Sequence, residues 1–188
     1  MRDIHGSAYE DMRIIDTRVI WLASSYDSRG RPAAMAYEVS TSIEIAATPE
    51  NVWAVLADLA SYPQWHPVFL SVTGQLAAGS KLTIRTTVPA TGNPMTARVK
   101  VLTVEPGAEL RWASKLLGIT ISKRSFLLSP SGGGTLMVQS ATYRGLGGTR
   151  KGFRGGRIVN VIGSIQGTFE AINEVIKQQA EARQQAPG

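Results

Sequence analysis

The chain has 188 residues, of which 43% are hydrophobic and 18% are charged, and its net charge is +6. This composition is that of an ordinary globular domain, and it excludes a disordered chain. Cysteine is absent and only two histidines occur, which excludes disulfides, thiolate nucleophiles and zinc or iron–sulfur sites built on cysteine. We therefore expect one folded domain with no metal and no other cofactor.

No stretch of the sequence is apolar enough to cross a membrane. The longest unbroken apolar run, residues 52–57, has six residues, whereas a spanning helix needs about 20. The best candidate for a secretory signal, residues 19–23, is shorter still and has acidic residues upstream. We therefore expect a cytoplasmic protein.

Residues 1–36 are interpreted as an N-terminal extension, and residues 37–188 as the folded domain. The first 34 residues have no sustained hydrophobic period and end in the loop-like sequence Ser28-Arg29-Gly30-Arg31-Pro32. Met35 stands where the domain would naturally start. The extension is therefore either disordered or the product of a start assigned too far upstream.

The first regular elements are a strand and a helix. From Tyr37, apolar and polar residues alternate over nine residues, which predicts a half-buried strand. Thr48-Pro49-Glu50 follows, with an N-cap hydroxyl, a proline and an acid, in the order that favours the start of a helix. Two prolines, Pro63 and Pro67, end that helix and leave room for one short helical turn.

The rest of the chain predicts six further strands and one long helix. Turn sequences rich in glycine and proline recur every 10 to 15 residues, which leaves no room for crossover helices and favours antiparallel hairpins. Isoleucine and phenylalanine recur at helical spacing from Ile158 to Ile176, which predicts an amphipathic helix over about 157–184. The expected fold is α+β, a curved seven-stranded antiparallel sheet around a long C-terminal helix, with two short helices after the first strand. Because one helix cannot fill the concave side, a cavity is expected there.

Several short motifs resemble the START-type helix-grip superfamily. They are Ile43 to Trp53, Asp58 to Pro63, Trp65-His66-Pro67, Val104 to Gly107 before Leu110-Arg111-Trp112, and Phe169 to Glu174. The nearest branch is similar to the bacterial polyketide cyclase/dehydrase and lipid transport group, and the resemblance covers residues 37 to about 183. It implies a helix-grip fold and members that are cyclases, lyases or carriers of hydrophobic ligands.

The expected function is binding of a hydrophobic or amphipathic small molecule, such as a lipid, an isoprenoid or an aromatic polyketide, between the sheet and the C-terminal helix. The residues expected to line the site are Trp53, Phe69, Ile84, Met95, Val99, Trp112, Arg124, Phe126, Met137, Gln139, Tyr143, Ile165 and Phe169.

Arg124 is the charged member of this set. Alternation places it on the side of its strand that carries Phe126 and Leu128, where it would anchor an anionic head group and where Gln139 could hydrogen-bond to it. A bulge in the strand would instead turn Arg124 to solvent and Lys123 inward. The resemblance implies a histidine at the position of Arg124 and a polar pair at the positions of Gln139 and Ala141, so this chain departs from the family pattern at Arg124 and Ala141.

Two other functions stay open. A polyketide cyclase or dehydratase would work through acid–base groups of the cavity, for which His66 and Tyr143 are the candidates. His66, between Trp65 and Pro67, fits a packing or capping role better. A nucleic-acid-associated protein would use the segment 144–157, which has five basic residues, no acid and many glycines. Its place between the last strand and the long helix favours a solvated connection beside the cavity instead.

Overall fold

The computed structural model describes residues 18–22, 36–87, 92–116, 119–144 and 155–186. Eight strands and three helices occur in this part of the chain. In chain order they are β1 (Arg18–Leu22), β2 (Ala36–Ile45), α1 (Pro49–Ala57), α2 (Tyr62–Trp65), β3 (Phe69–Gly74), β4 (Lys81–Thr87), β5 (Pro94–Glu105), β6 (Glu109–Leu116), β7 (Ile119–Ser131), β8 (Gly134–Arg144) and α3 (Gly155–Gln185).

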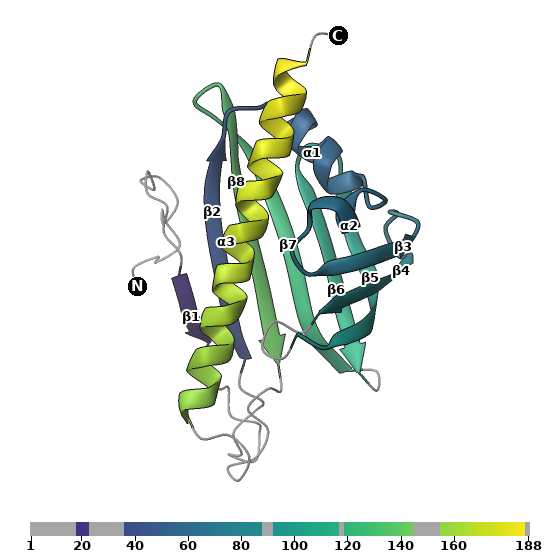
Figure 1. Ribbon diagram of the computed structural model, residues 1–188, viewed down its shortest axis with the longest axis vertical. Helices are drawn as coiled ribbons and strands as arrows, with labels where there is room; N and C mark the ends of the chain where they lie inside the picture. The colour runs from purple at the N-terminus through teal and green to yellow at the C-terminus, as the bar shows by residue number, and fades with distance from the viewer. Residues whose placement is uncertain (1–17, 23–35, 88–91, 117–118, 145–154, 187–188) are drawn as a thin grey trace, which may run out of the picture.

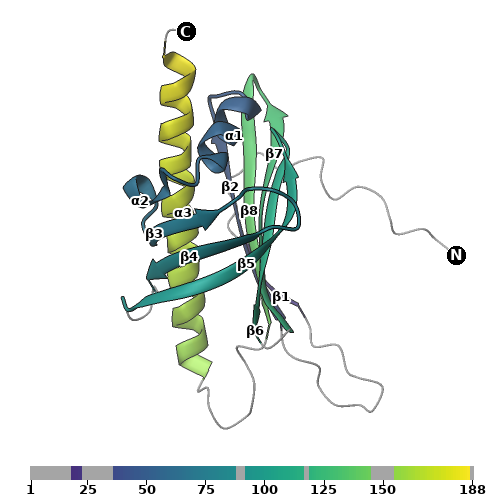
Figure 2. The same ribbon diagram turned by 90° about the vertical axis from the view of Figure 1, so that its right-hand side faces the viewer.

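The strands form one curved antiparallel sheet in the order β1-β2-β8-β7-β6-β5-β4-β3. Helix α3 runs along one face of this sheet, and α1 and α2 lie near its C-terminal half, between α3 and the far strands (Figure 1). The side view shows β3, β4 and β5 curving toward the side on which α3 lies (Figure 2). The seven strands β2 to β8, the two short helices and the long C-terminal helix confirm the fold expected from the sequence.

The structure adds an eighth strand that the sequence analysis did not predict. Strand β1 lies within the segment interpreted as an extension and pairs with β2, from Arg18 opposite Ser40 to Leu22 opposite Ala36. Five residues give too short a period to identify a strand, and this one forms along the free edge of β2. The segment 1–36 therefore contains a regular element, and the other residues of that segment lie outside the described part.

Helix α1 begins where its capping sequence predicts. The hydroxyl of Thr48 accepts a hydrogen bond from the backbone N–H of Asn51 at 3.4 Å, and Pro49 occupies the first turn. The C-terminal end of α3 binds the same junction, because Glu181 accepts from the Ala46 N–H at 2.8 Å and Gln184 accepts from the Thr48 N–H at 3.2 Å. These bonds fix α3 across the end of β2.

The buried apolar residues form two separate clusters. The main core fills the space between the sheet, α1, α2 and the C-terminal half of α3. A smaller cluster of Val39, Ala141 and Phe169, with Tyr143 and Ile165 packed against it, lies further toward the N-terminal end of α3. The interior is therefore not one continuous apolar core.

No helix in the described residues is both long and apolar enough to cross a membrane. Most of the basic segment 144–157, namely residues 145–154, lies outside the described part of the chain. The prediction that this segment binds nucleic acid therefore falls outside the described residues.

Candidate functional site

Four polar side chains from four different elements meet between the two apolar clusters. They are Thr41 of β2, Arg124 of β7, Gln139 of β8 and Asn173 of α3, and we call them the polar belt. Asn173 donates from Nδ2 to Oγ1 of Thr41 at 2.8 Å. In the carboxamide orientation that satisfies both neighbours, Gln139 donates to Oδ1 of Asn173 at 2.5 Å and accepts from Nε of Arg124 at 3.0 Å and from its Nη2. The belt is a continuous hydrogen-bonded chain from the helix to the guanidinium.

Arg124 points to the concave face of the sheet, among aromatic rings. Its guanidinium carbon lies over the rings of Phe169, Phe126 and Phe69, at 4.5, 5.3 and 5.9 Å from the ring centroids. These contacts place Arg124 inward, as strand alternation predicts. Lys123 is exposed on the other face.

The charge of Arg124 has no acidic counterpart among the described residues, because none of their carboxylates forms an ion pair with it. Burial lowers the pKa of its guanidinium, while the nearby phenols of Tyr143 and Tyr62 act in the opposite direction. An arginine stays protonated in proteins, so the site holds a fixed positive charge in apolar surroundings. Arg124 is only half-buried by surface area, so part of it remains accessible.

The two tyrosines near Arg124 are both neutral phenols. Burial raises the pKa of Tyr143, and Arg124 lowers it in part. Burial also raises the pKa of Tyr62, whose hydroxyl donates to the carbonyl oxygen of Leu56 at 2.6 Å. Neither group supplies a negative charge to Arg124 at neutral pH.

His66 is buried and fills a structural place at the end of α2. Its Nδ1 accepts hydrogen bonds from the backbone N–H groups of Val68, at 3.3 Å, and Phe69, at 3.1 Å. Its ring stacks on that of Phe69, with centroids 3.8 Å apart. Burial, and then the charge of Arg124, lower the pKa of His66 to about 2. The imidazole is therefore neutral at physiological pH, with its proton on Nε2.

Most of the apolar residues expected to line a ligand site pack in the main core. Members of that core are Phe69, Ile84, Val99, Trp112, Phe126 and Met137, with Trp53 packed against it. Only Ile165, Phe169 and Tyr143 belong to the smaller cluster on the other side of the polar belt.

Met95 is more exposed than the other apolar members of the expected set. It shares a face of β5 with Val99, yet 47% of its surface is exposed. It lies near the end of the strand, where alternation still gives the direction of a side chain but no longer its burial.

Three residues of this region were not among the predicted site residues. Thr41 alternates onto the same face of its strand as Val39 and Ile43, where a threonine fits ordinary packing. Asn173 follows Phe169 by four residues, so it stands as a polar residue on the apolar stripe of α3. That break in the stripe was the available signal. Tyr62 carried no signal beyond its place next to a proline.

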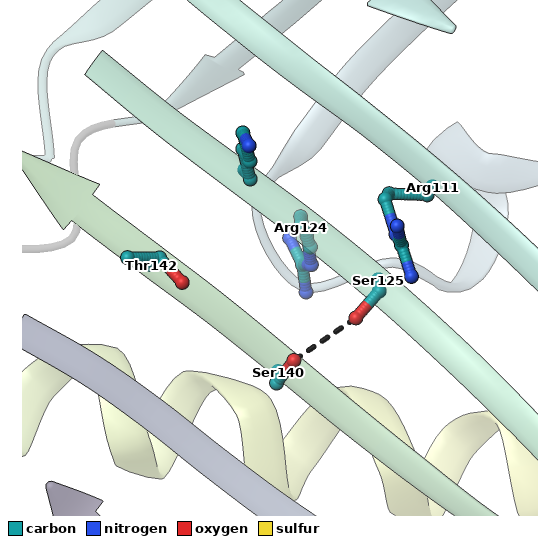
Figure 3. A pocket seen from close by; sticks show the side chains of 6 residues that line it. Arg111, Arg124, Ser125, Ser140 and Thr142 are labelled. Atoms are coloured by element: carbon teal, nitrogen blue, oxygen red, sulfur yellow. Dashed lines mark hydrogen bonds between the residues drawn. The ribbon is translucent and has the colours of Figure 1, made fainter. Parts of the chain in front are cut away.

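A shallow pocket of about 180 Å³ lies on the convex side of the sheet (Figure 3). It is bordered by Arg111, Lys123, Arg124, Ser125, Ser140 and Thr142. The hydroxyls of Ser125 and Ser140 lie 2.9 Å apart across β7 and β8. With a polar lining and little volume, this pocket does not suit an apolar ligand. In the described part of the chain, no three histidine or acidic side chains lie close enough together to hold a metal ion.

The family described as "Polyketide cyclase / dehydrase and lipid transport" matches residues 36–178. No curated protein matches the sequence.

Solved structures share the helix-grip fold at low sequence identity. A START superfamily protein from Mycobacterium smegmatis has a TM-score of 0.59 at 17% identity, covering 78% of this chain and 98% of that one. The di-domain ARO/CYC StfQ from the steffimycin biosynthetic pathway has a TM-score of 0.63 at 13% identity, covering 79% of this chain and 52% of that one. A Staphylococcus aureus protein of unknown function also has a TM-score of 0.63 at 13% identity, and the match covers 81% of this chain and 98% of that one. The chain belongs to the polyketide cyclase/dehydrase and lipid transport family.

Proposed function

We propose that the protein binds a hydrophobic or amphipathic small molecule between the sheet and α3, on the side of the polar belt where the smaller apolar cluster lies. The ligand is a lipid, an isoprenoid or an aromatic polyketide-like molecule. The membership of the family supports this proposal, since the family description includes lipid transport. The residues proposed to contact the ligand are Arg124, Gln139, Tyr143, Ile165 and Phe169.

The observation that carries the proposal is the setting of Arg124. Its charge lies among three phenylalanine rings, and its hydrogen-bond partner Gln139 is neutral. Leaving a partly desolvated charge without a counter-charge is unfavourable, and for a fully buried ion the penalty reaches roughly several kcal/mol. An amphipathic ligand would supply the polar group that Arg124 lacks, and its apolar body would cover the half-buried side chains of Tyr143 and Ile165.

Acid–base catalysis by His66 has less support than binding. A group whose pKa is about 2 stays deprotonated at neutral pH, and the Nδ1 of His66 already accepts two backbone hydrogen bonds. Tyr143, beside Arg124, is the remaining candidate for a proton donor in a cyclase or dehydratase. Loss of turnover in Tyr143→Phe, with ligand affinity retained, would favour the enzyme over the carrier.

The proposal is tested on purified full-length protein by native mass spectrometry and by solvent extraction of bound molecules. Binding of fatty acids, isoprenoids and aromatic polyketides is then measured by displacement of the neutral fluorescent probe N-phenyl-1-naphthylamine. We expect an apolar molecule to co-purify or to bind from this panel, and to bind more weakly to Arg124→Met. Lys123→Met is the matched control, because it removes a cation from the neighbouring position on the opposite face. Absence of any bound or binding apolar molecule would contradict the proposal.

A further inference from the structure

The hydrogen bonds of the Arg124 guanidinium leave one of its two outer edges without a full set of partners among the described residues. Gln139 accepts from both Nε and Nη2, so the edge formed by these two nitrogens is occupied. The rings of Phe126 and Phe169 lie against the guanidinium. The edge formed by Nη1 and Nη2 has no partner among the described residues other than the bond that Nη2 gives to Gln139. That edge matches the two oxygens of a planar carboxylate.

From this geometry we propose that the ligand head group is a single carboxylate bound as a monoanion at the Nη1/Nη2 edge of Arg124, with Asn173 of α3 as a positioning residue that acts through Gln139. This inference rests on the proposed function and specifies its ligand class.

The charge of the surroundings selects a monoanion. Gln139, Asn173 and Thr41 are neutral, and burial keeps the phenols of Tyr143 and Tyr62 protonated. His66 is neutral as well. The described groups around the site therefore carry one positive charge in total. A carboxylate balances that charge, whereas a phosphate monoester carries about −1.5 to −2 at pH 7 and would bring excess negative charge into an apolar site.

Asn173 fixes which way the carboxamide of Gln139 points. Asn173 donates to Thr41, which leaves its Oδ1 to accept from the Nε2 of Gln139. The oxygen of Gln139 must then face Arg124, where it holds the Nε/Nη2 edge. Without Asn173, the carboxamide of Gln139 could rotate, and the open edge of Arg124 would no longer have a fixed direction.

The test uses matched ligands that share a body and differ only in the head group. Dodecanoate is compared with 1-dodecanol and dodecyl phosphate, and 2-naphthoate with 2-naphthalenemethanol, each by displacement of N-phenyl-1-naphthylamine from the full-length protein. In the wild type we expect a carboxylate to bind about tenfold or more tightly than its alcohol. We also expect dodecanoate to bind more tightly than dodecyl phosphate.

The decisive variant is Gln139→Glu, which keeps the shape of the side chain and places a carboxylate on Arg124. Because this internal counter-ion neutralises the guanidinium, we expect the ratio of carboxylate affinity to alcohol affinity to fall to about one. Asn173→Leu is expected to lower the ratio of carboxylate affinity to alcohol affinity, because the carboxylates lose more affinity than the alcohols do. Lys123→Met is expected to change neither the affinity for the carboxylates nor the affinity for the alcohols.

Equal binding of acid and alcohol by the wild type would overturn the inference and leave the proposed function standing. An unchanged acid-to-alcohol ratio in Gln139→Glu, or tightest binding of dodecyl phosphate, would overturn it in the same way. If no ligand and no reporter binds, the proposed function fails together with the inference.

Discussion

Acid should destabilise this protein through His66. The buried imidazole accepts two backbone hydrogen bonds at Nδ1, so the folded state cannot protonate it without breaking them. The unfolded chain has no such constraint, and its histidine takes up a proton near the ordinary pKa of 6.5. Below that pH the unfolded state binds a proton that the folded state does not bind. The resulting stabilisation is present above pH 6.5 and is lost as the pH falls toward the folded pKa.

The size of the effect follows from the two pKa values. With 6.5 in the unfolded state and about 2 in the folded state, lowering the pH from 7.5 to 5.0 reduces the free energy of unfolding by about 2 kcal/mol through His66 alone. The loss begins near pH 6.5 and grows by about 1.4 kcal/mol for each further pH unit.

The assay is urea unfolding at pH 7.5 and pH 5.0 for the wild type and for His66→Asn. Asparagine can offer Oδ1 to the amides of Val68 and Phe69, and it does not titrate. All other ionisable groups are common to both proteins, so their contributions cancel in the difference. We expect the wild type to lose about 2 kcal/mol more than the variant between the two pH values. An equal loss in both proteins would refute the reasoning, whatever the stability of the variant at pH 7.5.

Two further predictions concern bonds that hold the helices in place. Tyr62→Phe keeps the ring but leaves the buried carbonyl of Leu56 without its hydrogen-bond donor. We therefore expect the free energy of unfolding, measured by urea titration, to fall by about 1–3 kcal/mol. A change below about 0.5 kcal/mol would contradict this role of the Tyr62 hydroxyl. Glu181→Ala removes the acceptor of the Ala46 N–H, so hydrogen exchange of that amide should become faster. Glu174→Ala, on an exposed side of α3, should leave the exchange rate of the Ala46 amide unchanged. Equal exchange rates in the two variants would show that Glu181 does not fix α3 to β2.

The order of the elements was predictable because each of them has a local signal. Alternation predicted β2, the sequence Thr48-Pro49-Glu50 predicted the start of α1, and the turn at Glu105–Gly107 has the positive φ of 73° at Gly107 that a Pro-Gly turn favours. Strand β1 was not predictable, because its pairing depends on the free edge of β2, a feature of the assembled sheet and not of residues 18–22 themselves.

The site was predictable only where it depends on direction along a strand. Alternation with Phe126 places Arg124 inward, and its opposite neighbour Gln139 follows from the same rule on β8. The partner of Gln139 on α3 could not be predicted, because the rotation and register of a helix against a sheet are set by the packing of the whole interface. Met95 shows the same limit for burial, which depends on what covers a strand end.

The polar belt lowers the stability of the fold, because it places a charge among apolar side chains. This loss of stability bears on ligand binding. On β2, β8 and α3 the polar residue stands between apolar neighbours of the same face, so each element departs from its pattern at the same level of the interior. Replacing buried charged groups with well-packed apolar ones often leaves a protein equally stable or makes it more stable. A core selected for stability alone would therefore carry no arginine here. When an anionic ligand reaches Arg124, the desolvated charge gains its counter-charge at a guanidinium already oriented by Gln139 and Asn173. Part of the cost of folding around Arg124 is then recovered as binding free energy, so affinity depends on how firmly the belt is held before the ligand arrives.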